Sequence, residues 1–184
     1  MNTQKNLIWL DLETTGLSPE TDRILEIATL ITDADLNIIA EGPALAVYQN
    51  QDTLLGMNDW CKKQHKESGL IAEIDGLLSH MNEHYAEQIT LDFIKQYVPT
   101  GVSPMCGNSI CFDRRFIIKY MPQLAQYFHY RNLDVSTVRE LGLHWSPEAI
   151  NDYTKKLAHR AMDDIHASVE ELQFYRERLF VTWE

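Results

Sequence analysis

Two acidic residues near the N-terminus have the spacing that metal-dependent chemistry needs. Asp11 and Glu13 are two residues apart at the end of an otherwise apolar segment, so a strand there would present both carboxylates on one face. Neighbouring carboxylates repel each other when ionised, and a divalent cation such as Mg²⁺ or Mn²⁺ removes that cost. The pair therefore predicts a metal site at a strand end, with two solvated acids at an exposed strand end as the alternative.

Three later residues have matching chemistry. Asp113 follows a short apolar segment where a helix is expected to begin, and the helix dipole alone also favours an acid there. His159 and Asp164 stand five residues apart at the expected start of the last helix. A histidine in that position can equally be structural or solvated. Each residue alone is ambiguous, and only their joint order along the chain is informative.

The elements that must position these residues follow from the hydrophobic pattern. Five strands are predicted, over residues 7–13, 24–32, 37–47, 102–107 and 132–135, with a hairpin turn at 33–35. Helices are predicted over 52–67, 70–75, 81–97, 113–120, 137–143 (with Ser136 as its N-cap) and 160–180. Three consecutive strands followed by helices that alternate with two strands predict an α/β domain with a mixed five-stranded sheet flanked by helices.

Composition excludes several classes of protein. The chain has 184 residues, of which 45% are hydrophobic and 23% are charged, as in an ordinary globular protein rather than a disordered or collagen-like one. Without repeats or linkers, a single domain over residues 1–184 is expected. No apolar stretch reaches the roughly 18 residues of a membrane span. The apolar run near the N-terminus is shorter than a secretory signal needs, so none is expected. With only three cysteines, a cytoplasmic protein without a disulfide framework is expected.

The net charge bears on the size of any nucleic-acid partner. It is −11 at pH 7, whereas proteins that bind long nucleic acids usually present a broad basic face. The overall field would repel a long polyanion, although a local basic pocket is compatible with this charge. The sequence therefore argues against long duplex nucleic acid and leaves small anionic substrates open.

The full set of motifs resembles a known group of nucleases. The segments 11–17 and 108–113, together with the His159-x-x-x-x-Asp164 spacing, resemble the Asp-Glu-Asp-Asp exonucleases with a histidine, the DnaQ-like branch of the ribonuclease H-like superfamily. Segments 9–17, 129–137 and 159–165, with the surroundings of Trp60, are similar to the oligoribonuclease family over nearly the whole chain. The resemblance implies a homodimeric 3′-to-5′ exoribonuclease. It would hydrolyse very short RNA, especially 5′-phosphorylated dinucleotides, to 5′-mononucleotides.

The resemblance also implies catalytic roles. Two Mg²⁺ or Mn²⁺ ions would be held by four ligands, Asp11, Glu13, Asp113 and Asp164. The spacing typical of the family selects Asp164 rather than Asp163 as the fourth acid. His159 would be the general base, a role that suits a side chain whose ordinary pKa lies near working pH.

Substrate-binding roles are implied in the same way. Leu17 would separate the two bases and Trp60 would stack on one of them. Ser109, Arg131, Ser136 and Thr137 would close around the 5′-phosphate. Tyr130 and Arg131 would come from the neighbouring subunit, and His65 would contact the product phosphate. Without the resemblance, these residues are also compatible with ordinary core, surface or turn positions.

Two other functions are compatible with parts of the pattern. A general 3′-to-5′ exonuclease for longer single-stranded RNA or DNA would share the same catalytic residues. It would also need a basic track, for which there are scattered candidates, Arg114, Arg115, Lys155, Lys156 and Arg160. An inactive scaffold that only binds RNA ends would have lost at least one metal ligand, and none of the expected ligands is missing.

Overall fold

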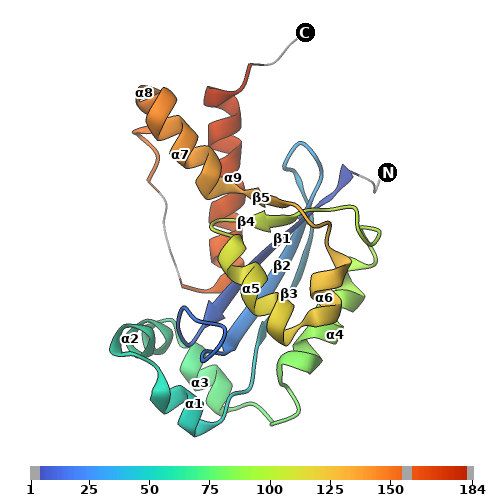
Figure 1. Ribbon diagram of the computed structural model, residues 1–184, viewed down its shortest axis with the longest axis vertical. Helices are drawn as coiled ribbons and strands as arrows, with labels where there is room; N and C mark the ends of the chain where they lie inside the picture. The colour runs from blue at the N-terminus through green and yellow to red at the C-terminus, as the bar shows by residue number, and fades with distance from the viewer. Residues whose placement is uncertain (1–4, 155–158, 182–184) are drawn as a thin grey trace.

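The computed structural model describes residues 5–154 and 159–181 and is built on a five-stranded sheet of order β3-β2-β1-β4-β5 (Figure 1). An antiparallel meander is formed by β1 (Leu7–Thr14), β2 (Ile24–Thr32) and β3 (Ile38–Ala46). The short strands β4 (Met105–Gly107) and β5 (Asn132–Asp134) extend it in parallel. The mixed five-stranded sheet predicted from the sequence is confirmed.

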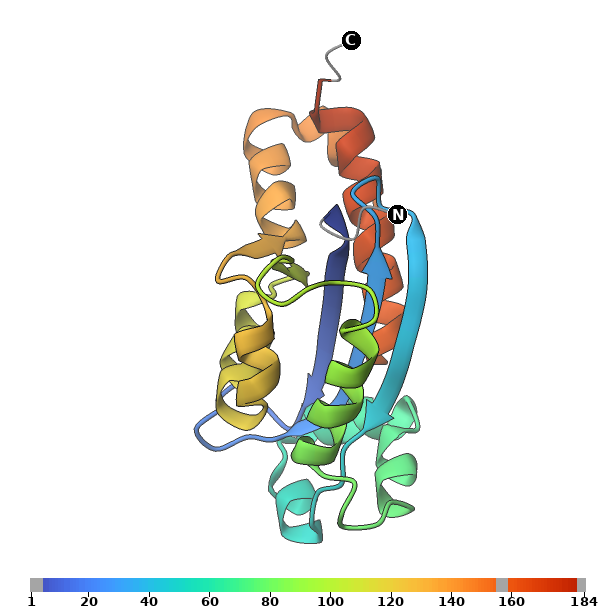
Figure 2. The same cartoon turned by 90° about the vertical axis from the view of Figure 1, so that its right-hand side faces the viewer.

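Helices cover both faces of the sheet and one of its ends (Figures 1 and 2). One face carries α4 (Glu83–Ile94), α5 (Cys111–Tyr120) and α6 (Pro122–Tyr127). The other face carries α9 (Ala161–Leu179), beside which α7 (Val135–Trp145) and α8 (Pro147–Ile150) pack. The end near the C-terminus of β1 is covered by α1 (Gln51–Gly56), α2 (Asp59–Glu67) and α3 (Leu70–Asp75). None of the helices in the described residues is long and apolar enough to cross a bilayer.

The alternation of side chains along β1 decides which way its acids face. Ile8, Leu10 and Leu12 belong to the core that packs under α4, α5 and α6. Trp9 belongs to the second core, which it shares with buried residues of α9. Because side chains of a strand alternate between faces, Asp11 and Glu13 follow Trp9 toward the α9 face. The expected common face of the two acids thus coincides with the face that carries the last helix.

Several predicted boundaries are wrong for local reasons. The predicted helix over 52–67 is two helices, because Asn58 accepts a hydrogen bond from the Cys61 N–H and starts α2 anew. Ser136 is not an N-cap: the Asp134 carboxylate accepts from the Ser136 N–H and caps α7 two residues earlier. Neither α6 nor α8 was predicted, because both helices are short. The main sequence signal for each is a proline near its start.

Candidate active site

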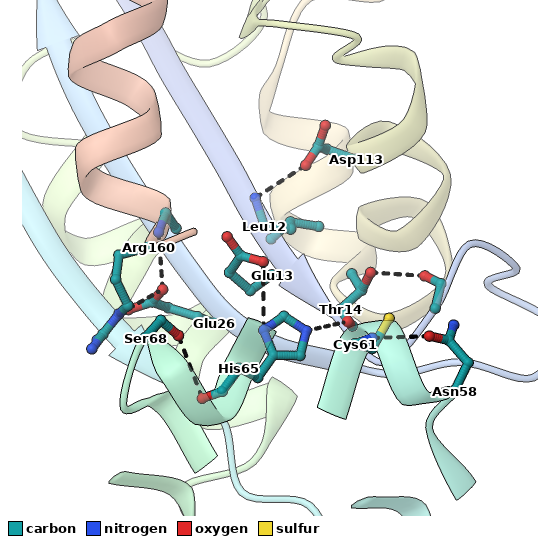
Figure 3. A network of polar contacts seen from close by, with 12 residues as sticks. Leu12, Glu13, Thr14, Glu26, Asn58, Cys61, His65, Ser68, Asp113 and Arg160 are labelled. Carbon is teal, nitrogen blue, oxygen red and sulfur yellow. Dashed lines mark hydrogen bonds and ion pairs between the residues drawn. The ribbon is translucent and has the colours of Figure 1, made fainter. Parts of the chain in front are cut away.

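Three of the predicted catalytic side chains meet at the end of β1. Glu13 on β1, His159 just before α9 and Asp164 in the first turn of α9 each offer one ligand atom, and these atoms lie within 4.8 Å of one another. Glu13 points into the space between the strand end and α2 (Figure 3). The sheet and the last helix therefore bring together residues that are about 150 positions apart in the sequence. Such a group can hold a divalent cation.

Asp113 approaches the same strand from α5. Its buried carboxylate accepts a hydrogen bond from the Leu12 N–H, with 3.0 Å between nitrogen and Oδ1 (Figure 3). The register pairs Trp9 with Cys106, and β4 ends at Gly107, so β1 continues beyond its parallel neighbour. Asp113 thus satisfies a backbone donor of β1 beyond the end of β4.

Asp11 completes the expected acidic set from a neighbouring position. It is half-buried on β1, directly before Leu12, and pairs in register with Ala28 of β2. Within residues 5–154 and 159–181, Asp11 and Asp113 fall outside the 4.8 Å group. The four acids therefore flank one strand end, with two of them in the compact group and two beside it.

Burial makes the charged forms of two of these acids, Glu13 and Asp113, unfavourable. Desolvation raises the pKa of Glu13 to about 8, and the nearby carboxylates of Asp164 and Glu26 add to the effect while Arg160 opposes it. Desolvation likewise raises the pKa of Asp113 to about 8, with Glu13 as a further contributor. Buried, mutually repelling carboxylates are the donor set that a hard divalent cation stabilises. The residues present therefore fit a metal centre.

The segment that carries His159 is anchored by a residue that the sequence analysis missed. Glu26 on β2 is buried and accepts from Arg160 Nη2 at 2.6 Å and from the Ala161 N–H at 2.9 Å (Figure 3). Arg160 also binds Glu73 of α3 at 2.9 Å. The available signal was a single acid in a strand that is otherwise without charge. This anchor fixes the start of α9 directly after His159, whose φ of 54° is left-handed.

His65 lies beside Glu13 and is buried rather than exposed. Its ring is buried, with Nε2 2.9 Å from the Thr14 carbonyl oxygen and Nδ1 3.8 Å from Glu13 Oε2. Desolvation lowers the pKa of this histidine. Because a carbonyl oxygen can only accept, Nε2–H is the donor in the contact with Thr14. The contact supports the strand end at Glu13, and contact with a product phosphate stays a prediction.

The candidate base-binding residues, Leu17 and Trp60, are 78% and 61% exposed, so both side chains are accessible to a ligand. Tyr130, expected to reach a neighbouring subunit, is 75% exposed. The Trp60 ring stands edge-on to His159, with 5.8 Å between ring centroids. An apolar platform therefore lies directly beside the predicted general base.

The candidate phosphate-binding residues divide into two groups. Ser109 and Ser136 are in contact, with 3.1 Å between their hydroxyl oxygens, and the Ser109 N–H donates to Ser136 Oγ and to Asp134 Oδ1. Arg131 precedes β5 and Thr137 lies in the first turn of α7, both exposed. The structure thus brings the two serines together and places the other two residues on adjoining segments.

The basic residues considered for a long-strand track are engaged elsewhere. Arg160 binds two glutamates as described, and Arg114 binds Asn132 Oδ1 and two backbone carbonyls. Arg115 lies 3.9 Å from Glu20, and Lys155 and Lys156 lie outside the described residues. The described part of the chain gives the long-strand track little support.

Comparison with known proteins agrees with this geometry. A family model described as an exonuclease, of the RNase T type, matches residues 8–172. Curated proteins named oligoribonuclease are similar at 56% identity over 174 residues in Pasteurella multocida and 57% over 174 residues in Haemophilus influenzae, each time covering 95% of this chain and 94% of the relative. A third, from Shewanella frigidimarina, is 57% identical over 175 residues, covering 95% of this chain and 96% of the relative.

Solved structures show the same fold. Escherichia coli exonuclease I bound to a dA16 oligonucleotide aligns with a TM-score of 0.70 at 18% identity, covering 95% of this chain and 41% of that chain. Exonuclease I from Methylocaldum szegediense aligns with a TM-score of 0.65 at 22% identity and the same coverage. At these identities the likeness concerns the fold alone, and it confirms the expected ribonuclease H-like α/β architecture.

Proposed function

Because this chain belongs to the oligoribonuclease family of exonucleases, we infer that it is a 3′-to-5′ exoribonuclease that hydrolyses very short RNA. One observation carries the proposal: Glu13, His159 and Asp164 meet within 4.8 Å, and the exposed Trp60 ring stands beside His159. The residues proposed to hydrolyse the phosphodiester therefore lie next to a ring on which one base can stack. Such a site suits the last linkage of a short strand.

The exonuclease family to which the site belongs uses divalent metal ions, and we propose two, Mg²⁺ or Mn²⁺, held by Asp11, Glu13, Asp113 and Asp164. The raised pKa values of Glu13 and Asp113 support this ligand set, because bound cations offset the cost of burying those charges. When bound, such ions acidify a water molecule and stabilise the leaving 3′-oxygen. The protein's contribution is to hold the acids in a fixed arrangement around the strand end.

His159 is proposed as the general base. It lies within reach of the acidic group, and the anchored start of α9 holds it there. Its imidazole takes a proton from the attacking water, and the cleavage releases a 5′-mononucleotide from the 3′ end. Trp60 beside it orients the terminal nucleotide by stacking, and Leu17 separates the two bases.

The length preference is proposed to come from the 5′ side of the pocket. In a dinucleotide the 5′-phosphate is carried by the second nucleotide from the 3′ end. We propose that this phosphate is bound by Ser109, Ser136, Arg131 and Thr137. Residues closing around that group leave no path for a longer strand. We therefore propose 5′-phosphorylated dinucleotides as the preferred substrates. We also propose that His65 contacts the phosphate of the product.

The exposed Tyr130 supports a second subunit as part of the site. Tyr130 and Arg131 project from the segment before β5, and the Arg131 guanidinium lies 5.4 Å from the Tyr130 ring centroid. We propose that in a homodimer this pair reaches the pocket of the partner. The free cysteines, Cys61, Cys106 and Cys111, fit the reducing cytoplasm that we propose as the compartment.

The test compares substrates of different length. The protein is incubated with Mg²⁺ and 5′-phosphorylated RNA of two, five and twenty nucleotides at limiting enzyme, and initial rates are measured. Much faster cleavage of the dinucleotide supports the proposal. If the twenty-nucleotide strand is shortened at the same rate, the catalytic centre is supported but the closed pocket is contradicted. A general exonuclease would then be the better assignment.

A further inference from the structure

A buried carboxylate lies outside the catalytic group, in the core between α9 and the two serines. Glu171 of α9 is only 2% exposed. Its Oε1 accepts from the Tyr175 hydroxyl at 2.8 Å, and its Oε2 accepts from the Asn108 amide nitrogen at 2.8 Å. A buried acid is costly and is tolerated where its hydrogen bonds are well made. The catalytic chemistry proposed above does not use it.

The orientation of the Asn108 side chain follows from its partners. One amide hydrogen goes to Glu171 Oε2, and the other goes to Ser168 Oγ at 3.0 Å. Ser168 is an acceptor in that contact, because its own hydroxyl donates to the Asp164 carbonyl at 2.7 Å. With both amide hydrogens directed toward α9, the Asn108 carbonyl oxygen must face away from that helix.

That carbonyl sets the direction of the hydrogen bonds at the two serines. Ser136 Oγ donates its single hydrogen to Asn108 Oδ1 at 2.9 Å and accepts from the Ser109 N–H at 3.0 Å. In the 3.1 Å contact between the two hydroxyls, Ser109 must therefore be the donor. The Ser136 hydrogen is held by a fixed partner, whereas the hydrogen of the exposed Ser109 can turn toward a ligand.

We propose that Glu171 is a positioning residue for recognition of the substrate's 5′-phosphate. It holds the Asn108 amide so that Ser136 points inward and Ser109 supplies the hydroxyl donor to the phosphate. The inference rests on the proposed function, because it takes the two serines as part of the phosphate site. It goes beyond that function in assigning a role to a residue that never touches the substrate.

The test uses Glu171→Gln and two substrates that differ only in the 5′-phosphate. Glutamine keeps the shape but offers a single acceptor oxygen, for which the Asn108 amide and the Tyr175 hydroxyl compete, so the hydrogen bond that holds the Asn108 amide is weakened. The readout is the ratio of kcat/KM for a 5′-phosphorylated dinucleotide to that for the same dinucleotide with a 5′-hydroxyl. We expect the ratio to fall roughly tenfold, the size of one lost hydrogen bond, through a higher KM. Turnover of the 5′-hydroxyl dinucleotide should stay near the wild-type value.

Two variants serve as controls. Glu170→Gln makes the same chemical change at an exposed position of α9 and should leave the ratio unchanged. Tyr175→Phe removes a different donor to Glu171 while leaving the bond between Glu171 and Asn108, and it should also preserve the ratio. If Glu171→Gln does not fold, Asn108→Ala breaks the same chain at a half-buried position and should lower the ratio to a similar extent.

The outcomes separate this inference from the proposed function. If Ser109→Ala and Ser136→Ala leave the phosphate preference intact, the phosphate site itself is wrong. If those variants lower the preference but folded Glu171→Gln and Asn108→Ala do not, the serines bind phosphate and the positioning role is overturned. A positioning role also predicts that Glu171→Gln has no further effect on the ratio in a Ser136→Ala background.

Discussion

The acidic group at the end of β1 and the exposed residues around it are built in opposite ways. Glu13, Asp113 and Asp164 lie on regular elements, are buried or half-buried, and repel one another electrostatically. Leu17 and Trp60 are exposed, and Leu17 lies on a loop. In the first region, a bound cation can stabilise the charged carboxylates, which are otherwise unfavourable. In the second, a nucleobase can stack on exposed apolar surface. Chemistry and substrate choice should therefore respond to different mutations.

The largest effect should come from removing a buried acid. Asp113→Asn keeps an oxygen that can accept from the Leu12 N–H but deletes a ligand charge. Because a metal contributes several kcal/mol to the transition state, kcat should fall by about 10³-fold or more. Calorimetry should show weaker Mg²⁺ binding in parallel. Wild-type affinity together with wild-type turnover would contradict the ligand assignment.

Removing the general base should be nearly as costly but leave the metal in place. His159→Ala is expected to lower kcat by about 10²- to 10⁴-fold. Mg²⁺ affinity, measured by calorimetry, should change little, because the acids remain. The matched control is His166→Ala, which alters a half-buried histidine of α9 that lies 3.2 Å from Glu41. Unchanged turnover in His159→Ala would remove its proposed role.

Breaking the ion pair between Arg160 and Glu26, which anchors the start of α9, should lower the free energy of unfolding. Arg160→Gln leaves the buried Glu26 carboxylate without its cation, which should cost about 3 kcal/mol of unfolding free energy. Arg178→Gln is the control, because it breaks an exposed pair with Asp152 and should cost at most about 1 kcal/mol. Denaturant melts of the two variants give the comparison. Equal losses would mean that Glu26 does not depend on Arg160.

The exposed platform should affect binding rather than turnover. Trp60→Ala removes the stacking surface, and stacking is worth about 1–3 kcal/mol per base. The KM for a dinucleotide should rise by roughly tenfold or more while kcat changes little. Leu55→Ala, at another exposed apolar position on α1, should leave both constants unchanged. A fall in kcat alone would show instead that the ring acts on His159.

The same contrast explains how much the sequence could predict. Strand alternation places Asp11 and Glu13 on one face, so this much of the site follows from local pattern. The motif resemblance supplied Asp164 and the exposed residues. Glu26, Asn108 and Glu171 were missed because their partners come from distant elements, and a lone polar residue in an apolar segment does not reveal its partner. The capping of α7 by Asp134 was missed because Ser136, two residues further on, is itself a residue type favoured at helix N-caps.

The smallest effect concerns the pH dependence of the metal-free protein. The pKa of Glu13 rises from its ordinary value of 4.5 to about 8, so the folded state keeps a proton that the unfolded chain releases above its ordinary pKa. Stability from this source is full at low pH and declines as the pH rises from about 4.5 toward 8, since the unfolded state then binds fewer protons. Bound Mg²⁺ should offset that decline, so the gain in Tm on adding Mg²⁺ should increase between about pH 6 and pH 8. In Glu13→Gln the pH dependence of the metal-free Tm should flatten. If the gain in Tm on adding Mg²⁺ is the same at every pH in the wild type, then Mg²⁺ does not stabilise the charged forms of these acids.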